Sequence, residues 1–320
     1  MTTGHRWEFG LAAVTVVIAA SVFSSRTAVA QSTSRLPATK PADARPVITA
    51  YNCTKPGAPV AADVVWKADD GAVKWGEWRV RVGEKKLPVL VIVTIVAPRR
   101  TQLSLDIARE GDNLGAWSVS SAPISARFAV NAGQFTDAGP WGWVVHRGRE
   151  QQKPGSGALA GALVVDTAGK WSLIDANDIT MHRLSLGVRE AVQSYPTLIN
   201  SAGRIPSELC AGSKGVDLEH RDTRLVVGTV PTGELVLAMT RFDGLGETAE
   251  RLPIGPTSPE MIEVMRALGA TRALMLDGGL SAQMMVRTAT NARPREWAGL
   301  RKVPLALVGL PTPTPPPPRD

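Results

Sequence analysis

Runs of apolar residues with strand-like patterning dominate the middle of the chain and predict a core built on β-sheet. Residues 88–97 read PVLVIVTIVA, a continuous β-branched run typical of a strand buried on both faces. Two pairs of shorter apolar runs flank turn-forming triplets and predict β-hairpins around Thr167-Ala168-Gly169 and Pro231-Thr232-Gly233. The hairpin strands and the other predicted strands are residues 163–166, 170–174, 223–230, 234–240, 127–130, 272–276 and 303–308.

Helical periodicity is confined to a few segments, of which residues 258–268 give the strongest signal. Thr257 and Glu260 have the spacing of a capping box, and Gly269 follows where the helix would end. Apolar residues recur at positions i, i+3, i+4 and i+7 from Met261, which predicts one buried stripe. We predict a second helix around residues 187–192. Several strands with few helices indicate a mixed α+β fold, a single domain with a strand-rich sheet core.

Both ends of the chain differ in composition from its middle. Residues 1–30 combine a basic start, an uncharged run at 11–23 and the small-residue site Ala28-Val29-Ala30, the pattern of a secretory signal peptide. An uncleaved membrane anchor is the alternative, although a span needs about 20 apolar residues. Residues 31–46 are a polar, proline-bearing linker, and residues 311–320 are a proline-rich tail. We therefore expect a folded domain at 47–310 and an exported protein, periplasmic or secreted, cleaved near Ala30 without a stable membrane span.

Composition narrows the function classes without naming an activity. In 320 residues, 44% are hydrophobic and 20% are charged, which excludes a disordered acidic protein, a collagen and a polytopic membrane protein. The net charge is +7, but the basic residues are scattered and lack the signature of a nucleic-acid-binding fold. We expect no nucleic-acid partner. A mildly basic surface could also attract anionic glycans or phosphate-bearing substrates.

The two cysteines, Cys53 and Cys210, leave two alternatives open. In an oxidising compartment they could form a disulfide that ties the N-terminal segment to the middle of the core. They could equally remain two buried thiols. The chain has no CxxC motif and only four histidines, which argues against a structural zinc site.

The segment ALMLDGGLS at residues 273–281 carries the sharpest chemical signal. A predicted apolar strand ends in Asp277, and Gly278 and Gly279 follow, where glycine permits positive φ and close approach of a ligand. Asp277 would then lie at the edge of the sheet beside backbone N–H groups and the Ser281 hydroxyl. The alternative is a turn in which Asp277 only bonds its own backbone.

A second strand end has the same pattern. The strand at 127–130 leads into Asn131-Ala132-Gly133-Gln134-Phe135, where an amide could hold a sugar hydroxyl or a phosphate oxygen. Trp141 and Trp143 follow shortly afterwards. Aromatic faces suit sugar rings, but ordinary core packing is the other interpretation of both tryptophans.

Two further segments are weaker when each is taken alone. Gln193 precedes the turn at Tyr195-Pro196, and Arg224 stands near the start of a predicted strand in a cation-rich stretch. An arginine there could bind phosphate through two hydrogen bonds, or it could form a surface ion pair with Asp222.

Taken together and in order, these four segments resemble the phosphodiester glycosidase family. The elements NAGQF, QSYPTLI, TRLVVG and LMLDGGLSAQM carry the resemblance, which extends over about residues 127–307. The family includes the lysosomal enzyme that removes N-acetylglucosamine from mannose-6-phosphodiesters, and many exported bacterial proteins. The resemblance implies a hydrolase that cleaves the bond between a sugar and a phosphodiester, with an envelope or extracellular glycan as its substrate.

The resemblance also assigns roles to individual residues. The residues implied for catalysis are Asp277, Asn131 and Arg224, and those implied for substrate binding are Gly133, Phe135, Gln193, Gly278, Gly279 and Ser281. Three positions depart from the family's pattern: Tyr195 replaces a usual glycine, Leu280 a small residue, and Ala282 a second serine. A bulky Tyr195 could narrow the pocket or supply a stacking face.

The chemistry of these residue types suits the implied reaction. Phosphate is a good leaving group, so such a site needs hydrogen-bond donors for the phosphate and a carboxylate for an oxocarbenium-like transition state. No second carboxylate is evident in a comparable motif, and Asp243, Asp137 and His146 are the candidates for that role. No cofactor is required; Ca²⁺ or Mg²⁺ would suit the oxygen ligands, but no ligand spacing supports either.

Two other function classes remain open. One is a non-catalytic glycan- or phosphate-binding protein on the same fold, and the presence of both Asp277 and Ser281 favours the enzyme over it. The other is a structural envelope protein tethered through the proline-rich tail.

Overall fold

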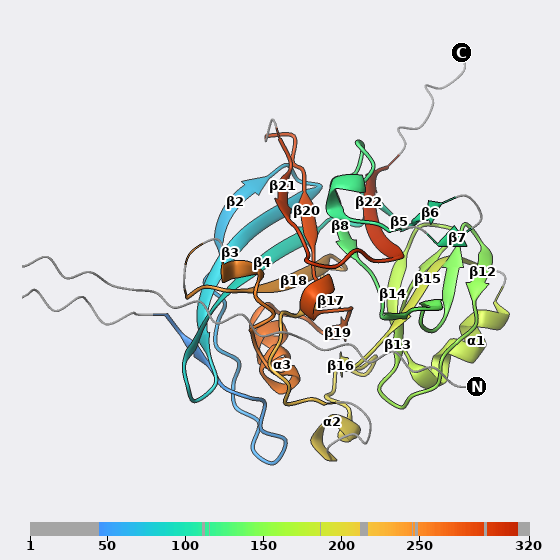
Figure 1. Ribbon diagram of the computed structural model, residues 1–320. Helices are drawn as coiled ribbons and strands as arrows, with labels where there is room; N and C mark the ends of the chain where they lie inside the picture. Colours follow the sequence, from blue (N-terminus) through green and yellow to red (C-terminus); the bar gives the residue numbers. More distant parts are fainter. Residues whose placement is uncertain are drawn as a thin grey trace, which may run out of the picture. The chain divides into compact units, whose positions relative to one another are not determined.

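The computed structural model describes residues 45–312 apart from 111–112, 115, 186, 212–216, 245, 247–248 and 291–292. The predicted signal peptide, nearly all of the linker and the tail from residue 313 lie outside these ranges. Three large sheets, two short two-stranded ladders and a few helices make up the described part (Figure 1). The α+β prediction, strand-rich with few helices, is therefore confirmed.

The main sheet has the strand order β1-β3-β4-β18-β17-β19-β16, with β2 paired to β3. Its pairs are antiparallel except for β1 with β3, so the sheet is mixed. The central strand β4 is buried on both faces, as the run at 88–97 predicted. The bounds of these strands are β1 Val47–Ile48, β2 Val65–Asp69, β3 Val73–Val82, β4 Leu87–Val96, β16 Thr197–Ile199, β17 Leu225–Thr229, β18 Leu235–Phe242 and β19 Arg272–Met275.

Two five-stranded sheets accompany the main sheet, in the orders β12-β11-β15-β13-β14 and β21-β20-β8-β22-β5. In Figure 1, β2 to β4 (blue to cyan) and β12 to β15 (green to yellow) lie on opposite sides of the molecule. The bounds are β5 Thr101–Ile107, β8 Phe128–Asn131, β11 Val144–His146, β12 Arg149–Gln152, β13 Gly161–Asp166, β14 Trp171–Asp175, β15 Val188–Ser194, β20 Met284–Val286, β21 Arg295–Trp297 and β22 Leu305–Pro311. Two short ladders pair β6 (Arg109–Glu110) with β7 (Asn113–Leu114) and β9 (Phe135–Thr136) with β10 (Gly139–Pro140).

The three large sheets share a hydrophobic core. Ile92 of β4, Phe128 of β8 and Leu163 of β13 belong to one buried cluster. The other face of the main sheet is covered by helix α3 (Ser258–Ala267), whose Met261 and Met265 pack in a second buried cluster with β4 and β18. Removal of this apolar area from water supplies the main favourable contribution to folding.

Both hairpin predictions and the helix predicted at residues 258–268 are confirmed. Strands β13 and β14 are antiparallel across the turn containing Gly169, and β17 and β18 across the turn containing Gly233. Both glycines adopt positive φ, +84° and +86°. In α3 the Thr257 hydroxyl accepts from the Glu260 N–H, and the Glu260 carboxylate accepts from the Thr257 N–H, which completes the capping box.

The helix predicted around residues 187–192 is wrong. This segment lies in β15, which pairs with both β11 and β13 in the middle of its sheet. Its Glu190 is buried, yet its carboxylate accepts from the Ser104 hydroxyl at 3.1 Å and contacts His146 Nδ1 at 3.0 Å. These partners, which come from other strands, satisfy the buried Glu190 carboxylate in the middle of the sheet. The other short helices are α1 (Ile179–Leu184) and α2 (Ser207–Ala211).

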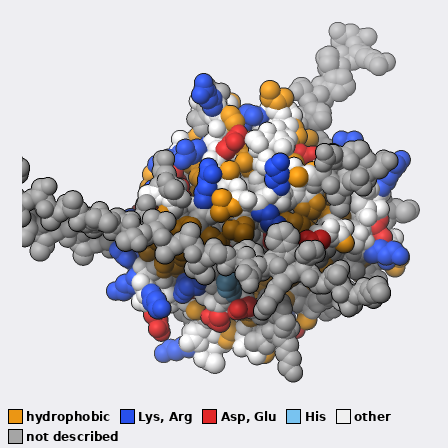
Figure 2. All heavy atoms as spheres, in the orientation of Figure 1, with side chains coloured by type: hydrophobic (Ala, Val, Ile, Leu, Met, Phe, Trp, Pro, Cys, Tyr) orange, Lys and Arg blue, Asp and Glu red, His pale blue; other side chains and the backbone are white. Residues whose placement is uncertain are grey.

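Cys53 and Cys210 form a disulfide, which decides between the two alternatives left by the sequence. The bond joins the segment after β1 to helix α2 across 157 residues. No helix within the described ranges is both long and apolar enough to cross a lipid bilayer. Figure 2 shows lysine and arginine side chains scattered among acidic and apolar ones over the visible face, as the sequence predicted.

Candidate active site

Asp277 lies where the main sheet meets β8 of a neighbouring sheet. It follows the end of β19, and its N–H donates to the carbonyl oxygen of Ala132 at 3.1 Å. Asn131, at the end of β8, donates from Nδ2 to the Asp277 carbonyl at 2.7 Å and accepts from the Gln283 N–H at 2.9 Å. Asn131 is 0% exposed, so both ends of its amide hold backbone in place. The two strand ends singled out in the sequence therefore form one structural unit.

Steric contacts explain why two glycines follow Asp277. A Cβ on Gly278 would lie 2.5 Å from the Thr223 carbonyl oxygen, and a Cβ on Gly279 would lie 2.7 Å from Oδ2 of Asp222. Gly279 also adopts φ +57° and donates its N–H to the Thr223 carbonyl at 2.8 Å. Only glycine lets the loop approach this closely. The loop then continues into a single 3-10 turn, Gly279–Ser281.

The carboxyl group of Asp277 has an altered acidity. Burial raises its pKa to about 6, and the negative charge of Asp222 acts in the same direction. Hydrogen bonds from the Ser281 hydroxyl and the Gly278 N–H, together with the positive charge of Arg301, partly oppose this rise in pKa. The Gly278 contact is the local turn bond that the sequence offered as an alternative. It coexists here with the neighbourhood expected of a functional carboxylate, since perturbed carboxyl groups are typical of catalytic sites.

The site has a second carboxylate, Asp222, which the sequence analysis did not assign to it. Burial raises its pKa, while the charges of Arg224 and His220 and the Thr223 N–H, which donates at 2.8 Å, oppose that rise. The sequence showed Asp222 only as an ion-pair partner for an arginine, because no glycine motif marks its position. It reaches Asp277 because β17, which follows Asp222, pairs with β19, which precedes Asp277.

Arg301 is the second residue that was missed. Its guanidinium carbon lies 4.5 Å from the centre of the Phe135 ring, within the range of a cation–π contact. Its backbone N–H donates to the Leu280 carbonyl at 2.9 Å, which ties residue 301 to the loop after Asp277. The Arg301 side chain is exposed, so an anionic ligand can reach it.

Arg224 has mainly backbone partners in the described part of the structure. Its Nε donates to the Pro256 carbonyl at 3.0 Å, and one terminal nitrogen donates to the His220 carbonyl. Burial lowers the pKa of Arg224, and the nearby Asp222 carboxylate opposes this. These contacts fix the segment that carries Asp222.

Gln193 and Gly133 also contact the protein backbone. The Gln193 side chain is 0% exposed, and its Oε1 accepts from the N–H groups of Trp143 at 2.7 Å and Gly155 at 2.9 Å. A Cβ on Gly133 would lie 2.4 Å from the Gln193 carbonyl oxygen. The Gln193 side chain therefore holds the backbone just before β11 and just after β12.

For the two tryptophans the sequence offered core packing or an exposed face for a sugar, and the structure shows one tryptophan of each kind. Trp143 is 1% exposed and packs in a buried cluster. Trp141 is partly exposed and meets Tyr195 edge to face, with ring centres 4.9 Å apart. The bulky residue that replaces a glycine in the family's pattern thus contacts a second aromatic ring.

Of the three candidates for a second acid–base group, Asp243 and His146 form ion pairs elsewhere, and Asp137 lies in an exposed turn. Asp243 pairs with Arg45 at 2.7 Å and Arg79 at 3.3 Å. His146 pairs with Glu190 at 3.0 Å, and Asp137 is exposed between β9 and β10. Among the residues that the structure describes, no three His, Cys, Asp or Glu side chains cluster in a way that could hold a metal ion.

Comparison with solved structures shows where this fold occurs. A protein of unassigned function from Synechocystis matches with a TM-score of 0.51 and 15% identity over 78% of this chain and 64% of that one. This chain therefore spans less than two thirds of that protein. The catalytic domain of zebrafish N-acetylglucosamine-1-phosphodiester alpha-N-acetylglucosaminidase, auto-inhibited by its pro-peptide, matches with a TM-score of 0.57 and 15% identity over 78% of this chain and 88% of that domain. At such identities the likeness shows the fold alone.

No curated protein matches the chain at a significant level. The family model for phosphodiester glycosidase matches residues 125–308, more than half of the chain and close to the range over which the four motifs occur. This chain belongs to the phosphodiester glycosidase family.

Proposed function

We propose that this protein is an exported hydrolase that cleaves a sugar-1-phosphodiester between the anomeric carbon and the phosphate oxygen. The observation that carries the proposal is Asp277, whose pKa is raised to about 6 in the family's Asp-Gly-Gly-x-Ser loop. Asp222 and Arg301 act electrostatically on the same carboxyl group. Perturbed carboxylates beside an exposed cation suit attack on a phosphorylated sugar.

The two carboxyl groups and the cation have distinct roles in this proposal. A pKa of about 6 leaves Asp277 mostly ionised at neutral pH, so it can accept a proton from an attacking water. The water oxygen forms a bond to the anomeric carbon as the bond to the phosphate oxygen breaks. The phosphomonoester leaves with that electron pair, while Arg301 binds its negative charge. Asp222 adds to the effect of burial on the pKa of Asp277, and it stabilises positive charge on the sugar ring.

The remaining motif residues shape the site. The N–H group of Gly278 and the Ser281 hydroxyl hold the Asp277 carboxylate, and Phe135 supports Arg301. Asn131 and Arg224 act as positioning residues, because their side chains hold the backbone on either side of the carboxylates. Gly133 lets the segment after β8 approach the Gln193 carbonyl, and the Gln193 side chain holds the backbone next to Trp141. Trp141 and Tyr195 together offer an aromatic edge to a sugar.

Export is part of the proposal. The pattern of residues 1–30 is that of a signal peptide, and the disulfide between Cys53 and Cys210 is of the kind formed in oxidising compartments. An exported enzyme of this family would meet glycans of the envelope or the extracellular space. Fractionation of cells that express the full chain tests this, since export predicts a shortened protein outside the cytoplasm.

The activity is tested with the full chain and an N-acetylglucosamine-α-1-phosphodiester, by measuring released reducing sugar with and without a chelator. We expect release by the wild type and at least a thousandfold less by Asp277→Asn. The matched control is Asp137→Asn, the same change at an exposed turn, which should retain full activity. Sugar binding without release by the wild type would instead support the non-catalytic binding protein.

A further inference from the structure

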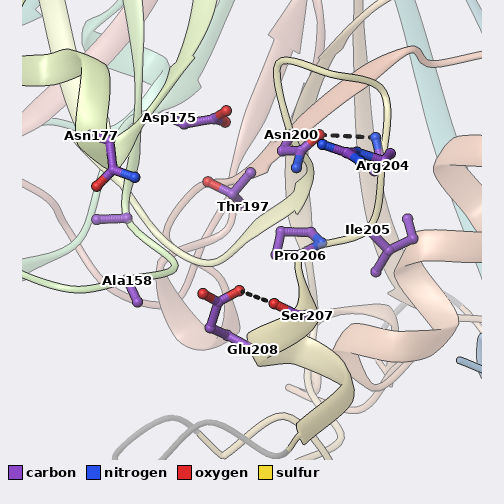
Figure 3. A pocket seen from close by; sticks show the side chains of 11 residues that line it. Ala158, Asp175, Asn177, Thr197, Asn200, Arg204, Ile205, Pro206, Ser207 and Glu208 are labelled. Atoms are coloured by element: carbon purple, nitrogen blue, oxygen red, sulfur yellow. Dashed lines mark hydrogen bonds between the residues drawn. The ribbon is translucent and has the colours of Figure 1, made fainter.

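Two cavities outside the carboxylate site differ in whether their polar groups already have partners. One, of about 460 Å³ between the end of β14 and helix α2, is drawn in Figure 3. Its side chains bond within the lining: the Asn200 oxygen accepts from the Arg204 N–H at 2.9 Å, and the Ser207 hydroxyl donates to Glu208 at 3.2 Å. The other, of about 180 Å³ beside β18 and β21, is lined by three arginines. These arginines form no ion pair with any residue that the structure describes.

The arginine-lined cavity lies against the loop that follows Asp277. Arg241, near the end of β18, is one of its walls, and Nη2 of Arg241 donates to the Ala282 carbonyl at 2.9 Å. Arg251 comes from the next 3-10 turn of the chain, and Arg295 comes from β21. None of the three charged side chains of the carboxylate site lines this cavity. The arginine-lined cavity is therefore a separate place, beside that site.

Arg241 is a buried cation without a carboxylate partner in the described part of the chain. It is 2% exposed, and burial lowers its pKa to about 10, which leaves it charged at neutral pH. Its Nη2 donates to the carbonyls of Ala282, Trp297 and Ala298 at 2.9, 3.3 and 3.1 Å. Nε and Nη1 make no hydrogen bond to a described residue, and neither is among the polar atoms that are both closed to solvent and unpartnered. Since arginine is rarely buried without an anion, these two nitrogens point to a ligand.

Arg251 and Arg295 are the accessible cations of this cavity. Both side chains are exposed, so a ligand that enters from solvent reaches them without moving the core. The guanidinium carbon of Arg295 lies 5.4 Å from the centre of the Trp297 ring, and this stacking orients its planar donors. The positive charge of Arg251 lowers the pKa of Arg241, so the two cations act on one another. A bound anion would relieve that repulsion.

Two glutamates, Glu250 and Glu296, also line the cavity. The charge of Glu250 raises the pKa of Arg241 and so opposes the effect of Arg251. Glu296 stands between Arg295 and Trp297 in β21, and adjacent residues of a strand point to opposite faces. The Glu296 side chain therefore points away from that of Arg295. Three cations against two carboxylates leave the lining with a net positive charge.

The size and charge of the cavity select a compact anionic group. Its volume of about 180 Å³ is below the range of about 300–1,000 Å³ that small-molecule sites occupy, so it suits one group better than a whole sugar. Guanidinium groups bind phosphoryl oxygens through paired, charge-assisted hydrogen bonds. Three guanidiniums from separate elements match the three terminal oxygens of a phosphomonoester better than the two oxygens of a carboxylate.

We propose that this cavity is a second binding site, which takes a phosphoryl group and holds it through Arg241, Arg251 and Arg295. The inference does not rest on the hydrolysis proposed for Asp277. Inorganic phosphate and a phosphorylated sugar present the same group, and the experiment separates them. A site beside the loop after Asp277 suits a glycan that carries a second phosphate.

Phosphorus NMR titration of the full chain tests the proposal, with inorganic phosphate and glucose 6-phosphate as probes. Because Arg301 also attracts phosphate, we compare the wild type with Arg301→Ala and expect binding in both. In the Arg301→Ala background, Arg251→Gln and Arg295→Gln should each weaken binding about tenfold, as expected for one charge-assisted hydrogen bond, and together they should abolish it. The matched control is Arg149→Gln, at an exposed position of β12, which should bind like its parent.

The two probes identify the source of the phosphoryl group. Tighter binding of glucose 6-phosphate assigns the site to a phosphorylated sugar, and tighter binding of inorganic phosphate assigns it to the free ion. Arg241→Met removes the buried charge while keeping a long side chain, and it should also lose binding. The melting temperature of this variant separates a lost contact from a lost fold, and the exposed Arg251 and Arg295 variants test the site without that risk.

Three results would overturn the second site. The first is that neither probe binds to Arg301→Ala. The second is binding that survives the combined Arg251→Gln and Arg295→Gln change. The third is an equal loss of affinity in Arg149→Gln, which would show only a general attraction of phosphate to a basic surface.

Discussion

Asp222 raises the pKa of Asp277, although 54 other residues separate the two in the chain. A Cβ on Gly279 would lie only 2.7 Å from Oδ2 of Asp222. The glycine loop therefore brings the two carboxyl groups into one electrostatic environment. Paired carboxyl groups of this kind commonly divide acid and base roles between them.

Asp222→Asn should therefore lower the pKa of Asp277 below about 6, because it removes the neighbouring negative charge. The measurement is an NMR titration of the Asp277 carboxyl carbon, assigned by its disappearance in Asp277→Asn. If the Asp222→Asn variant is active, the acidic limb of its pH–activity profile should move to lower pH. Asp243→Asn is the matched control, since that carboxylate pairs with Arg45 and Arg79. An unchanged Asp277 titration in Asp222→Asn would contradict the coupling.

Arg301→Ala should shift the same titration in the opposite direction. The guanidinium lowers the pKa of Asp277, so its removal should raise that pKa and move the acidic limb of activity to higher pH. Loss of phosphate binding should also raise KM about tenfold or more. Arg301→Lys keeps the charge but loses the planar stacking on Phe135, so it should restore part of both properties. Equal effects of the alanine and lysine variants would argue against a role for the charge.

The strands and the main helix could be predicted because their signals are local. The run at β4, the turn glycines Gly169 and Gly233, and the Thr257–Glu260 capping box each depend on neighbouring residues. The helix expected around residues 187–192 was wrong because Glu190 finds its partners on β5 and β11. Local patterning has no access to contacts of that kind.

The site could also be predicted only where its signals are local. Asp277 was found because a strand, a carboxylate and two glycines are consecutive, and Asn131 because it ends a strand in the same way. Asp222 and Arg301 act through position in space: one precedes a paired strand, and the other follows the loop that returns to Leu280. Sequence showed the residue types of Arg224 and Gln193, but it could not show that backbone carbonyls and N–H groups engage them.

The raised pKa of Asp277 should also appear in stability. The folded pKa of about 6 exceeds the unfolded value of about 3.9, so the folded state holds the proton more tightly between these pH values. Stability then falls as pH rises from about 4 to 6 and stays lower above that range. Asp277→Asn should be more stable than the wild type at pH 7 by on the order of 1–3 kcal/mol. Urea unfolding at pH 4 and pH 7 measures this, and a difference independent of pH would contradict it.

Gly279→Ala should abolish activity and destabilise the fold more than a glycine replacement at an open turn does. The new Cβ would approach Oδ2 of Asp222 to 2.7 Å at φ +57°, so the loop or the carboxylate must move. Gly233→Ala is the matched control: its φ is +86°, but no atom lies within 4 Å of the added Cβ. We expect about 1–2 kcal/mol of destabilisation for the control, from backbone conformation alone, and more for Gly279→Ala. Chemical denaturation of both variants compares them, and the Asp277 titration shows whether the control leaves the site intact. Equal destabilisation by Gly279→Ala and Gly233→Ala would mean that the close approach of Asp222 to the loop does not contribute to the cost of Gly279→Ala.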